Sequence, residues 1–147
     1  MTKNVSTKLI FKGVVQGVGF RPTVYRVARN LGSHGFVLNT GSEVEVVIDT
    51  DPDEFIAELK KILPSSARIS SVEKIPDDRI FSNFKIKKSK QGLKRSLIPV
   101  DTALCDDCLA ELFDENNRRN KYSFTNCTVC GARYSVIRKV PYDRKET

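Results

Sequence analysis

Long hydrophobic runs are missing from the beginning of this 147-residue sequence. Residues 1–8 are polar, and the apolar stretch that follows, Leu9 to Phe11, is far too short for a signal peptide or a membrane-spanning segment. The sequence also contains no internal repeat and no low-complexity tract. We therefore expect a protein that stays in the cytoplasm and has no membrane partner.

Histidine is scarce as well, because the sequence contains a single one, His34. It follows the first predicted helix. With no second histidine to pair with, a residue in this position is more often a solvated loop residue than a catalytic base. We interpret His34 as a solvated loop residue.

The composition excludes disordered and fibrous proteins. Hydrophobic residues make up 39% and charged residues 29%, as in a soluble globular protein, and the length suits one ordinary domain with an appendage. The net charge of +7 is spread over both halves of the chain. A mild positive field of this kind helps to recruit phosphorylated small molecules or nucleic acid and does not distinguish between them.

Hydrophobic periodicity predicts an α+β domain in residues 5–90. Apolar alternation, glycine turns and an acidic helix start divide this region into strands and helices. The predicted strands are residues 8–15, 36–40, 43–49, 69–75 and 81–87, and the predicted helices are residues 22–31 and 52–63. The order βαββαβ, with one more short strand, is that of a ferredoxin-like sandwich, in which two helices cover one face of an antiparallel sheet. The polar stretch from Ser89 to Leu97 indicates a linker, which we place at residues 91–100.

A glycine-rich turn joins the first predicted strand to the first predicted helix. It contains Gly17 and Gly19, and Arg21 and Pro22 open the helix. Glycines let backbone N–H groups turn inward, a helix N-terminus adds positive potential, and a guanidinium can hold two phosphoryl oxygens. The turn is therefore a candidate phosphate site, although an ordinary strand-to-helix turn with a surface arginine fits the bare pattern equally well.

The same turn resembles the signature of the acylphosphatase family, V-x-G-x-V-Q-G-V-x-F-R, and a G-x-V-x-N match follows at residues 35–39. The resemblance implies an acylphosphatase-like fold and hydrolysis of a small acyl phosphate with no metal and no covalent intermediate. It implies that Arg21 grips the phosphate and that Asn39 orients the attacking water. The backbone amides that would hold the phosphate oxygens are those of Gln16, Gly17, Val18, Gly19, Phe20 and Arg21.

Two features of this match leave alternatives open. Gly19 stands where stand-alone acylphosphatases have a bulky residue, which loosens the site and widens it for a different acyl group or lowers its activity. Asn39 also fits an ordinary turn residue before Gly41, because asparagine tolerates turn conformations.

Four cysteines form two Cys-x-x-Cys pairs, Cys105 with Cys108 and Cys127 with Cys130, separated by eighteen residues. This spacing presents four thiolates to one zinc ion, and Gly131 suits the tight turn after the last of them. Disulfides are disfavoured in a reducing compartment, and two equivalent pairs outside a βαβ unit disfavour a thioredoxin-like redox role. Because four cysteines leave no open coordination position, we predict a structural zinc in a zinc-finger segment at residues 101–147.

The string from Val100 to Arg144 resembles the first zinc finger of the HypF family of hydrogenase-maturation carbamoyltransferases, whose chains begin with an acylphosphatase-like domain. The resemblance covers residues 7–144. It implies that this part of the enzyme splits carbamoyl phosphate into carbamate and phosphate. Later domains of that family activate the carbamate with ATP and transfer the carbamoyl group to the C-terminal cysteine of a maturation partner protein. Those domains are absent from this sequence, so we interpret the chain as an N-terminal fragment or a truncated homologue.

A ferredoxin-like sheet with a zinc knuckle and a positive net charge could instead bind RNA without catalysing a reaction. The predicted strands lack the paired exposed aromatics that stack on bases, and the basic residues form no continuous stripe, so nucleic acid is the less favoured partner. A third interpretation is a loop that binds phosphate without hydrolysing it, in a chain that serves as a scaffold for the larger enzyme.

Overall fold

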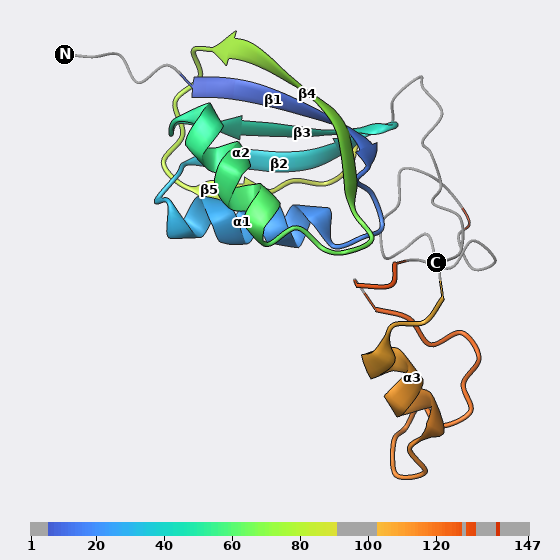
Figure 1. Ribbon diagram of the computed structural model, residues 1–147. Helices are drawn as coiled ribbons and strands as arrows, with labels where there is room; N and C mark the ends of the chain where they lie inside the picture. The colour runs from blue at the N-terminus through green and yellow to red at the C-terminus, as the bar shows by residue number, and fades with distance from the viewer. Residues whose placement is uncertain (1–5, 91–102, 128, 132–137, 139–147) are drawn as a thin grey trace.

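The computed structural model describes residues 6–90, 103–127, 129–131 and 138 of the chain (Figure 1). Its elements appear in the predicted order. They are β1 (Ser6–Val14), α1 (Phe20–Asn30), β2 (Gly35–Thr40), β3 (Glu43–Ile48), α2 (Pro52–Lys61), β4 (Arg68–Asp77), β5 (Phe84–Ile86) and α3 (Asp106–Phe113). The predicted linker at residues 91–100 and much of the second half of the predicted zinc-finger segment lie outside the described residues.

The five strands form one sheet in the order β4-β1-β3-β2-β5. β1 pairs antiparallel with both β3 and β4, and β2 pairs antiparallel with β3. β5 pairs with β2 in parallel. The predicted acylphosphatase-like sandwich is confirmed, but the prediction of a wholly antiparallel sheet is wrong, because the sheet is mixed.

The parallel pairing of β5 follows from the route of the chain between the two edges of the sheet. β4 and β5 are the edge strands, and residues 78–83 connect them (Figure 1). A segment of that length spans at most about 20 Å. Crossing four strand spacings takes about 19 Å, so the chain has no residues left to return along the sheet before β5 begins. It therefore enters β5 from the end at which β2 also begins.

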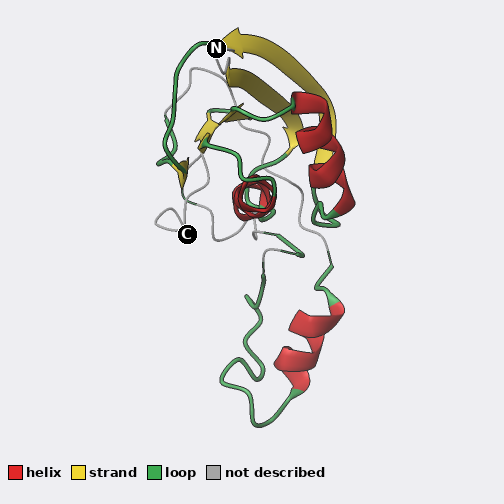
Figure 2. Cartoon of the chain, turned by 90° about the vertical axis from the view of Figure 1, so that its left-hand side faces the viewer, coloured by secondary structure: helices red, strands yellow, loops and turns green. Residues whose placement is uncertain are grey.

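Helices α1 and α2 cover one face of the sheet (Figures 1 and 2). Alternate residues of each strand point towards these helices, as the pleat requires. Burying this apolar face is the main source of stability for the domain. The core side chains include Leu9, Phe11, Val44, Val46 and Ile48 from the strands and Val24, Val27, Phe55 and Leu59 from the helices, each no more than 2% exposed.

The start of α2 is set by local interactions that the sequence predicts. The side chain of Asp51 accepts a hydrogen bond from the Glu54 N–H at 2.8 Å, and Pro52 occupies the first helical position. Acidic residues lie in the first turn and lysines in the last, and the helix dipole favours both positions. Among the described residues, no helix combines the length and apolar character needed to cross a membrane.

The opposite face of the sheet carries a smaller apolar cluster of Phe36, Leu38 and Val47. Phe81, from the segment that crosses between the edges, packs edge-on against Phe36 with ring centroids 5.6 Å apart. The guanidinium of Arg79 lies over both rings, 5.2 Å and 5.8 Å from their centroids. Aromatic and cation–π contacts therefore hold the crossing segment against the sheet.

Candidate functional site

The glycine-rich loop runs from the end of β1 to the first residue of α1. Gly17 and Gly19 have φ angles of +71° and +73°, in the left-handed region that favours glycine. Val18 lies between them and does not have a positive φ, so the sign of φ alternates from Gly17 to Gly19. Such alternation is typical of backbone nests, in which successive N–H groups turn towards one side and can bind an anion. Within the described residues, the amides of residues 17–20 donate no backbone hydrogen bond.

Gln16 fastens the beginning of this loop to the turn between β2 and β3. It is 7% exposed, and its Nε2 donates to the carbonyl oxygen of Gly41 at 2.9 Å and to that of Glu43 at 3.2 Å. The sequence predicted a role for the Gln16 backbone amide. The structure adds a side chain that ties the loop to the strand end beyond Asn39.

Arg21 lies in the first turn of α1 and is partly buried. Its Nη1 donates to Ser89 Oγ at 3.3 Å. Ser89 belongs to the polar stretch that indicated a linker, and sequence reasoning missed this contact. No local signal marks it, because Ser89 reaches Arg21 only through the position of β5.

Asn39 is on the core face of β2, opposite Val44 of β3, and is 1% exposed. Its carbonyl oxygen accepts the N–H of Lys90 at 2.9 Å, and Lys90 pairs with Thr40 in an isolated parallel bridge. The chain beyond β5 therefore continues along β2 as far as Lys90. These contacts bring the loop, the end of β2 and the segment containing Ser89 together at one end of the sheet.

The four cysteines come together in the second part of the chain, and their sulfur atoms all lie within 4.8 Å of one another. The separations are 3.5 Å between Cys105 and Cys127, 3.9 Å between Cys127 and Cys130, and 3.9 Å between Cys130 and Cys108. In a regular tetrahedron with Zn–S bonds of about 2.3 Å, neighbouring sulfurs are about 3.8 Å apart. The cluster therefore has the donor set and the dimensions that a structural zinc requires.

The pKa values of two thiols in the cluster shift in opposite directions. Burial raises the pKa of the Cys108 thiol well above its ordinary value. Burial also acts to raise the pKa of Cys130, but hydrogen bonds to its sulfur, including one from the Cys127 N–H at 3.4 Å, lower it to about 7. A dication bound at the centre of the cluster would favour the thiolate form of the cysteines.

With this geometry in view, comparison with known proteins places the chain. Residues 7–86 match the family model described as Acylphosphatase. The chain belongs to the acylphosphatase family. Residues 104–137 match a second model, described as the HypF finger, which contains all four cysteines. An acylphosphatase domain followed by a HypF finger is the arrangement that the sequence motifs predicted.

Individual relatives extend this result over nearly the whole chain. The probable carbamoyltransferase HypF of Methanocaldococcus jannaschii is 41% identical over 148 residues, covering 96% of this chain and 19% of the relative. An acylphosphatase of Caldivirga maquilingensis is 37% identical over 94 residues, covering 59% of this chain and 98% of the relative. The crystal structure of full-length HypF in its phosphate- and nucleotide-bound form matches with a TM-score of 0.83 and 36% identity, covering 97% of this chain and 20% of that chain.

The chain is thus similar to the N-terminal region of HypF and spans about a fifth of the length of these HypF relatives. The acylphosphatase domain supplies the loop, Arg21 and Asn39. The HypF finger supplies the cysteine cluster.

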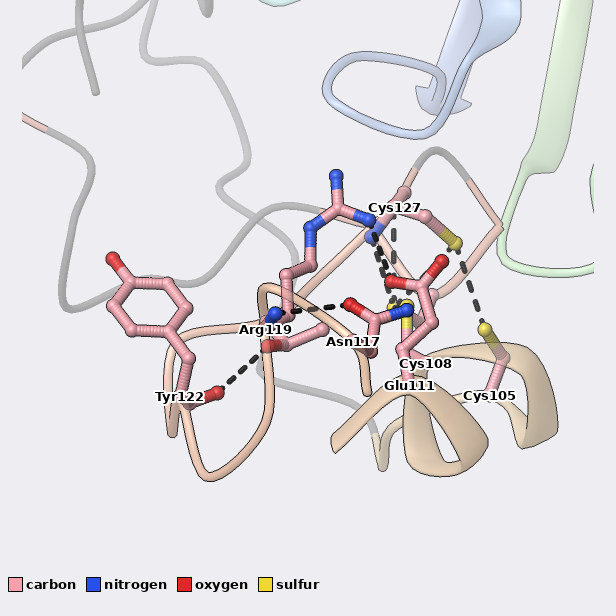
Figure 3. A network of polar contacts seen from close by, with 9 residues as sticks. Cys105, Cys108, Glu111, Asn117, Arg119, Tyr122 and Cys127 are labelled. Atoms are coloured by element: carbon pink, nitrogen blue, oxygen red, sulfur yellow. Dashed lines mark hydrogen bonds and ion pairs between the residues drawn. The ribbon is translucent and has the colours of Figure 1, made fainter. Parts of the chain in front are cut away.

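Within the HypF finger, α3 and the segment after it hold the first cysteine pair in place (Figure 3). α3 begins immediately after Cys105 and contains Cys108. Arg119 donates to the carboxylate of Glu111 on α3 at 2.6 Å, and the Lys121 N–H donates to the Leu112 carbonyl oxygen at 2.9 Å. These contacts fold residues 114–122 back against the helix.

His34 lies at the opposite end of β2 from Asn39 and takes no part in the candidate site of the acylphosphatase domain. Its Nδ1 is 2.8 Å from Asp49 Oδ2, and its N–H donates to Asp49 Oδ1 at 2.7 Å. The side chain is 45% exposed, in keeping with the loop position expected for it. The pairing with Asp49 was not predicted, because the two residues meet only when β2 and β3 form their hairpin.

Proposed function

We propose that this chain hydrolyses an acyl phosphate, namely carbamoyl phosphate, as the N-terminal module of a carbamoyltransferase. The supporting observation is the meeting of three segments at one end of the sheet, namely the loop, the end of β2 at Asn39 and the segment with Ser89. Similarity to acylphosphatases and to HypF proteins supports the reaction class. A maturation partner protein, the remaining domains of a longer enzyme and a cytoplasmic location are further parts of the proposal.

In the proposed reaction, the amides of residues 16–21 and the guanidinium of Arg21 hold the phosphoryl oxygens. A water molecule oriented by Asn39 attacks phosphorus, its oxygen forms the new P–O bond, and the bond from phosphorus to the acyl oxygen breaks. The leaving group is carbamate and the other product is inorganic phosphate. Because an acyl phosphate already has a good leaving group, positioning and charge stabilisation are sufficient catalysis.

We also propose that the cysteine cluster binds one zinc ion with a structural role. The four sulfurs would occupy all four positions of a tetrahedral zinc and leave none for water or substrate. The hydrolytic step then needs no cofactor, and the metal stabilises the fold of the HypF finger.

The direct test is phosphate release from carbamoyl phosphate, acetyl phosphate and benzoyl phosphate. Replacing Arg21 by alanine removes a positioned donor, which corresponds to about 3 kcal/mol of transition-state stabilisation or a rate loss on the order of 100-fold. Asn39→Ala is expected to lower the catalytic rate more than the affinity for phosphate. Arg26→Ala, which removes an exposed arginine from the same helix, is the matched control and is expected to keep the parent rate.

Each outcome has a distinct meaning. No turnover by the parent above the rate without protein would contradict hydrolysis by this chain and favour a phosphate-binding scaffold. Parent-like rates in both Arg21→Ala and Asn39→Ala would contradict the assignment of the site.

A further inference from the structure

The last turn of the cysteine cluster lies beside the glycine-rich loop between β1 and α1, which we call the phosphate loop because of its proposed role. Gly131 directly follows Cys130 and is buried. A Cβ atom on Gly131 would lie 3.6 Å from the Gly17 carbonyl oxygen and 3.7 Å from Val18 Cγ1, at van der Waals distance, so Gly131 lies beside the loop. Figure 3 shows the loop that follows β1 passing beside the cluster.

Gly131 also belongs to the turn that contains Cys127 and Cys130, which is the second knuckle of the cysteine cluster. Its N–H donates to the Cys127 carbonyl oxygen at 2.9 Å, which closes the Cys-x-x-Cys turn. Its φ of +85° lies in the left-handed region, where a side chain adds strain. One residue therefore completes the metal-binding turn and lies against the phosphate loop.

The Gln16 side chain fastens the beginning of the loop, and the Gly19 carbonyl oxygen accepts from Thr23, but the residues between them are held mainly by packing. Two of its residues are glycines with positive φ, and within the described residues the amides of residues 17–20 make no backbone hydrogen bond. Val18 is 1% exposed, and Gly131 provides part of its cover. The conformation of Gly17 and Val18 thus depends on the packing around them.

We propose that the metal-bound knuckle holds the phosphate loop in its binding conformation, with Gly131 as the positioning residue. This inference rests on the proposed phosphate-binding role of the loop. A zinc ion held by the four sulfurs would fix Cys130 through its Zn–S bond, and the neighbouring Gly131 would be fixed with it. A loop already ordered by this contact loses less conformational freedom when phosphate binds, so metal occupancy raises phosphate affinity.

The first experiment compares the zinc-loaded chain with the variant Cys105→Ser. This substitution removes a ligand from the first cysteine pair, which does not adjoin Gly131. Amide hydrogen exchange is measured at Gly17, Val18 and Gly19, and the Kd for inorganic phosphate is measured by calorimetry. The variant is expected to exchange at least about tenfold faster at these amides. Its phosphate Kd is expected to rise at least about fivefold, which corresponds to about 1 kcal/mol.

The second experiment changes Gly131 and leaves the cysteines intact. Gly131→Ala places a side chain at positive φ against the loop and is expected to keep one zinc per chain while showing the faster loop exchange. Gly32→Ala is the matched control, because Gly32 also has positive φ, +63°, but a Cβ there would meet nothing within 4 Å. The control is expected to leave loop exchange unchanged.

Core amides distinguish this coupling from a general loss of stability. Leu9 and Val46 are in the centre of the sheet and fully buried, and their exchange is expected to stay at the parent rate. Equal loop exchange with and without zinc would overturn the inference, as would a parallel rise at Leu9 and Val46. A metal-dependent loop that binds no phosphate would contradict the proposed function and leave the coupling supported.

Discussion

Arg21 is held by a side chain from a distant part of the sequence. Ser89 Oγ accepts from its Nη1 at 3.3 Å, although the two residues are 68 positions apart. A guanidinium that is already oriented when the substrate arrives has less freedom to lose on binding it. Ser89 is therefore a positioning residue for the proposed phosphate site.

Replacing Ser89 by alanine is expected to lower kcat/KM for an acyl phosphate about three- to tenfold, because one hydrogen bond contributes about 1 kcal/mol. The loss should be smaller than that of Arg21→Ala, since the guanidinium itself remains. Steady-state kinetics would measure it, with the exposed Ser82→Ala as the control. A loss as large as that of Arg21→Ala would mean that Ser89 contacts the substrate directly.

At the scale of secondary structure, the sequence predicts what depends on near neighbours. The start of α2 was predictable because Asp51, Pro52 and Glu54 set it within a few residues. The direction of β5 was not, because it depends on the width of the sheet that residues 78–83 cross. The Gly17 and Gly19 conformations followed from the glycine motif, whereas the Ser89 contact needs β5 to be placed first.

An ion pair between Arg79 and Asp77 helps to fasten the beginning of the segment between β4 and β5. Arg79 Nε donates to both carboxylate oxygens of Asp77, at 2.9 Å and 3.1 Å. The hydrogen bonds from Arg79 hold the pKa of Asp77 below its ordinary value, against the opposing effect of burial. The stability from this pair is complete above the unfolded pKa of about 3.9 and is lost as the pH falls through the lower folded pKa.

Asp77→Asn is expected to lower the free energy of unfolding at pH 7 by about 1 kcal/mol, a modest value because Arg79 is 49% exposed. Urea denaturation at pH 7 and at lower pH would measure this difference. The difference in unfolding free energy between the parent and Asp77→Asn should become smaller as the pH falls below about 4, where the parent loses the same interaction. Asp78→Asn, the same charge change at an exposed neighbour, is the control. A difference in unfolding free energy that becomes larger in acid would contradict this explanation.

At the scale of the whole molecule, two parts of the chain meet at the candidate site. The acylphosphatase domain provides the loop and the strand end, and the HypF finger places Gly131 against the loop. The cysteine spacing predicted that the four sulfurs would gather. It contained no information about which surface of the domain the last knuckle would touch, because that contact joins residues more than 100 positions apart.

We predict one zinc ion per chain, measured by elemental analysis of freshly purified reduced protein. Cys105→Ala and Cys130→Ala are each expected to lose most of it, because three thiolates hold zinc less tightly than four. Asp106→Asn, which changes an exposed residue between the first two cysteines, is expected to retain it. A metal content near zero in the parent would contradict the zinc assignment.

The most direct measurement is a crystal structure of the chain with inorganic phosphate. We predict phosphate oxygens within hydrogen-bond distance of the amides of residues 16–21 and of the Arg21 guanidinium, with Asn39 facing the position from which water would attack. Phosphate bound elsewhere, with Arg21 turned into solvent, would contradict the central claim.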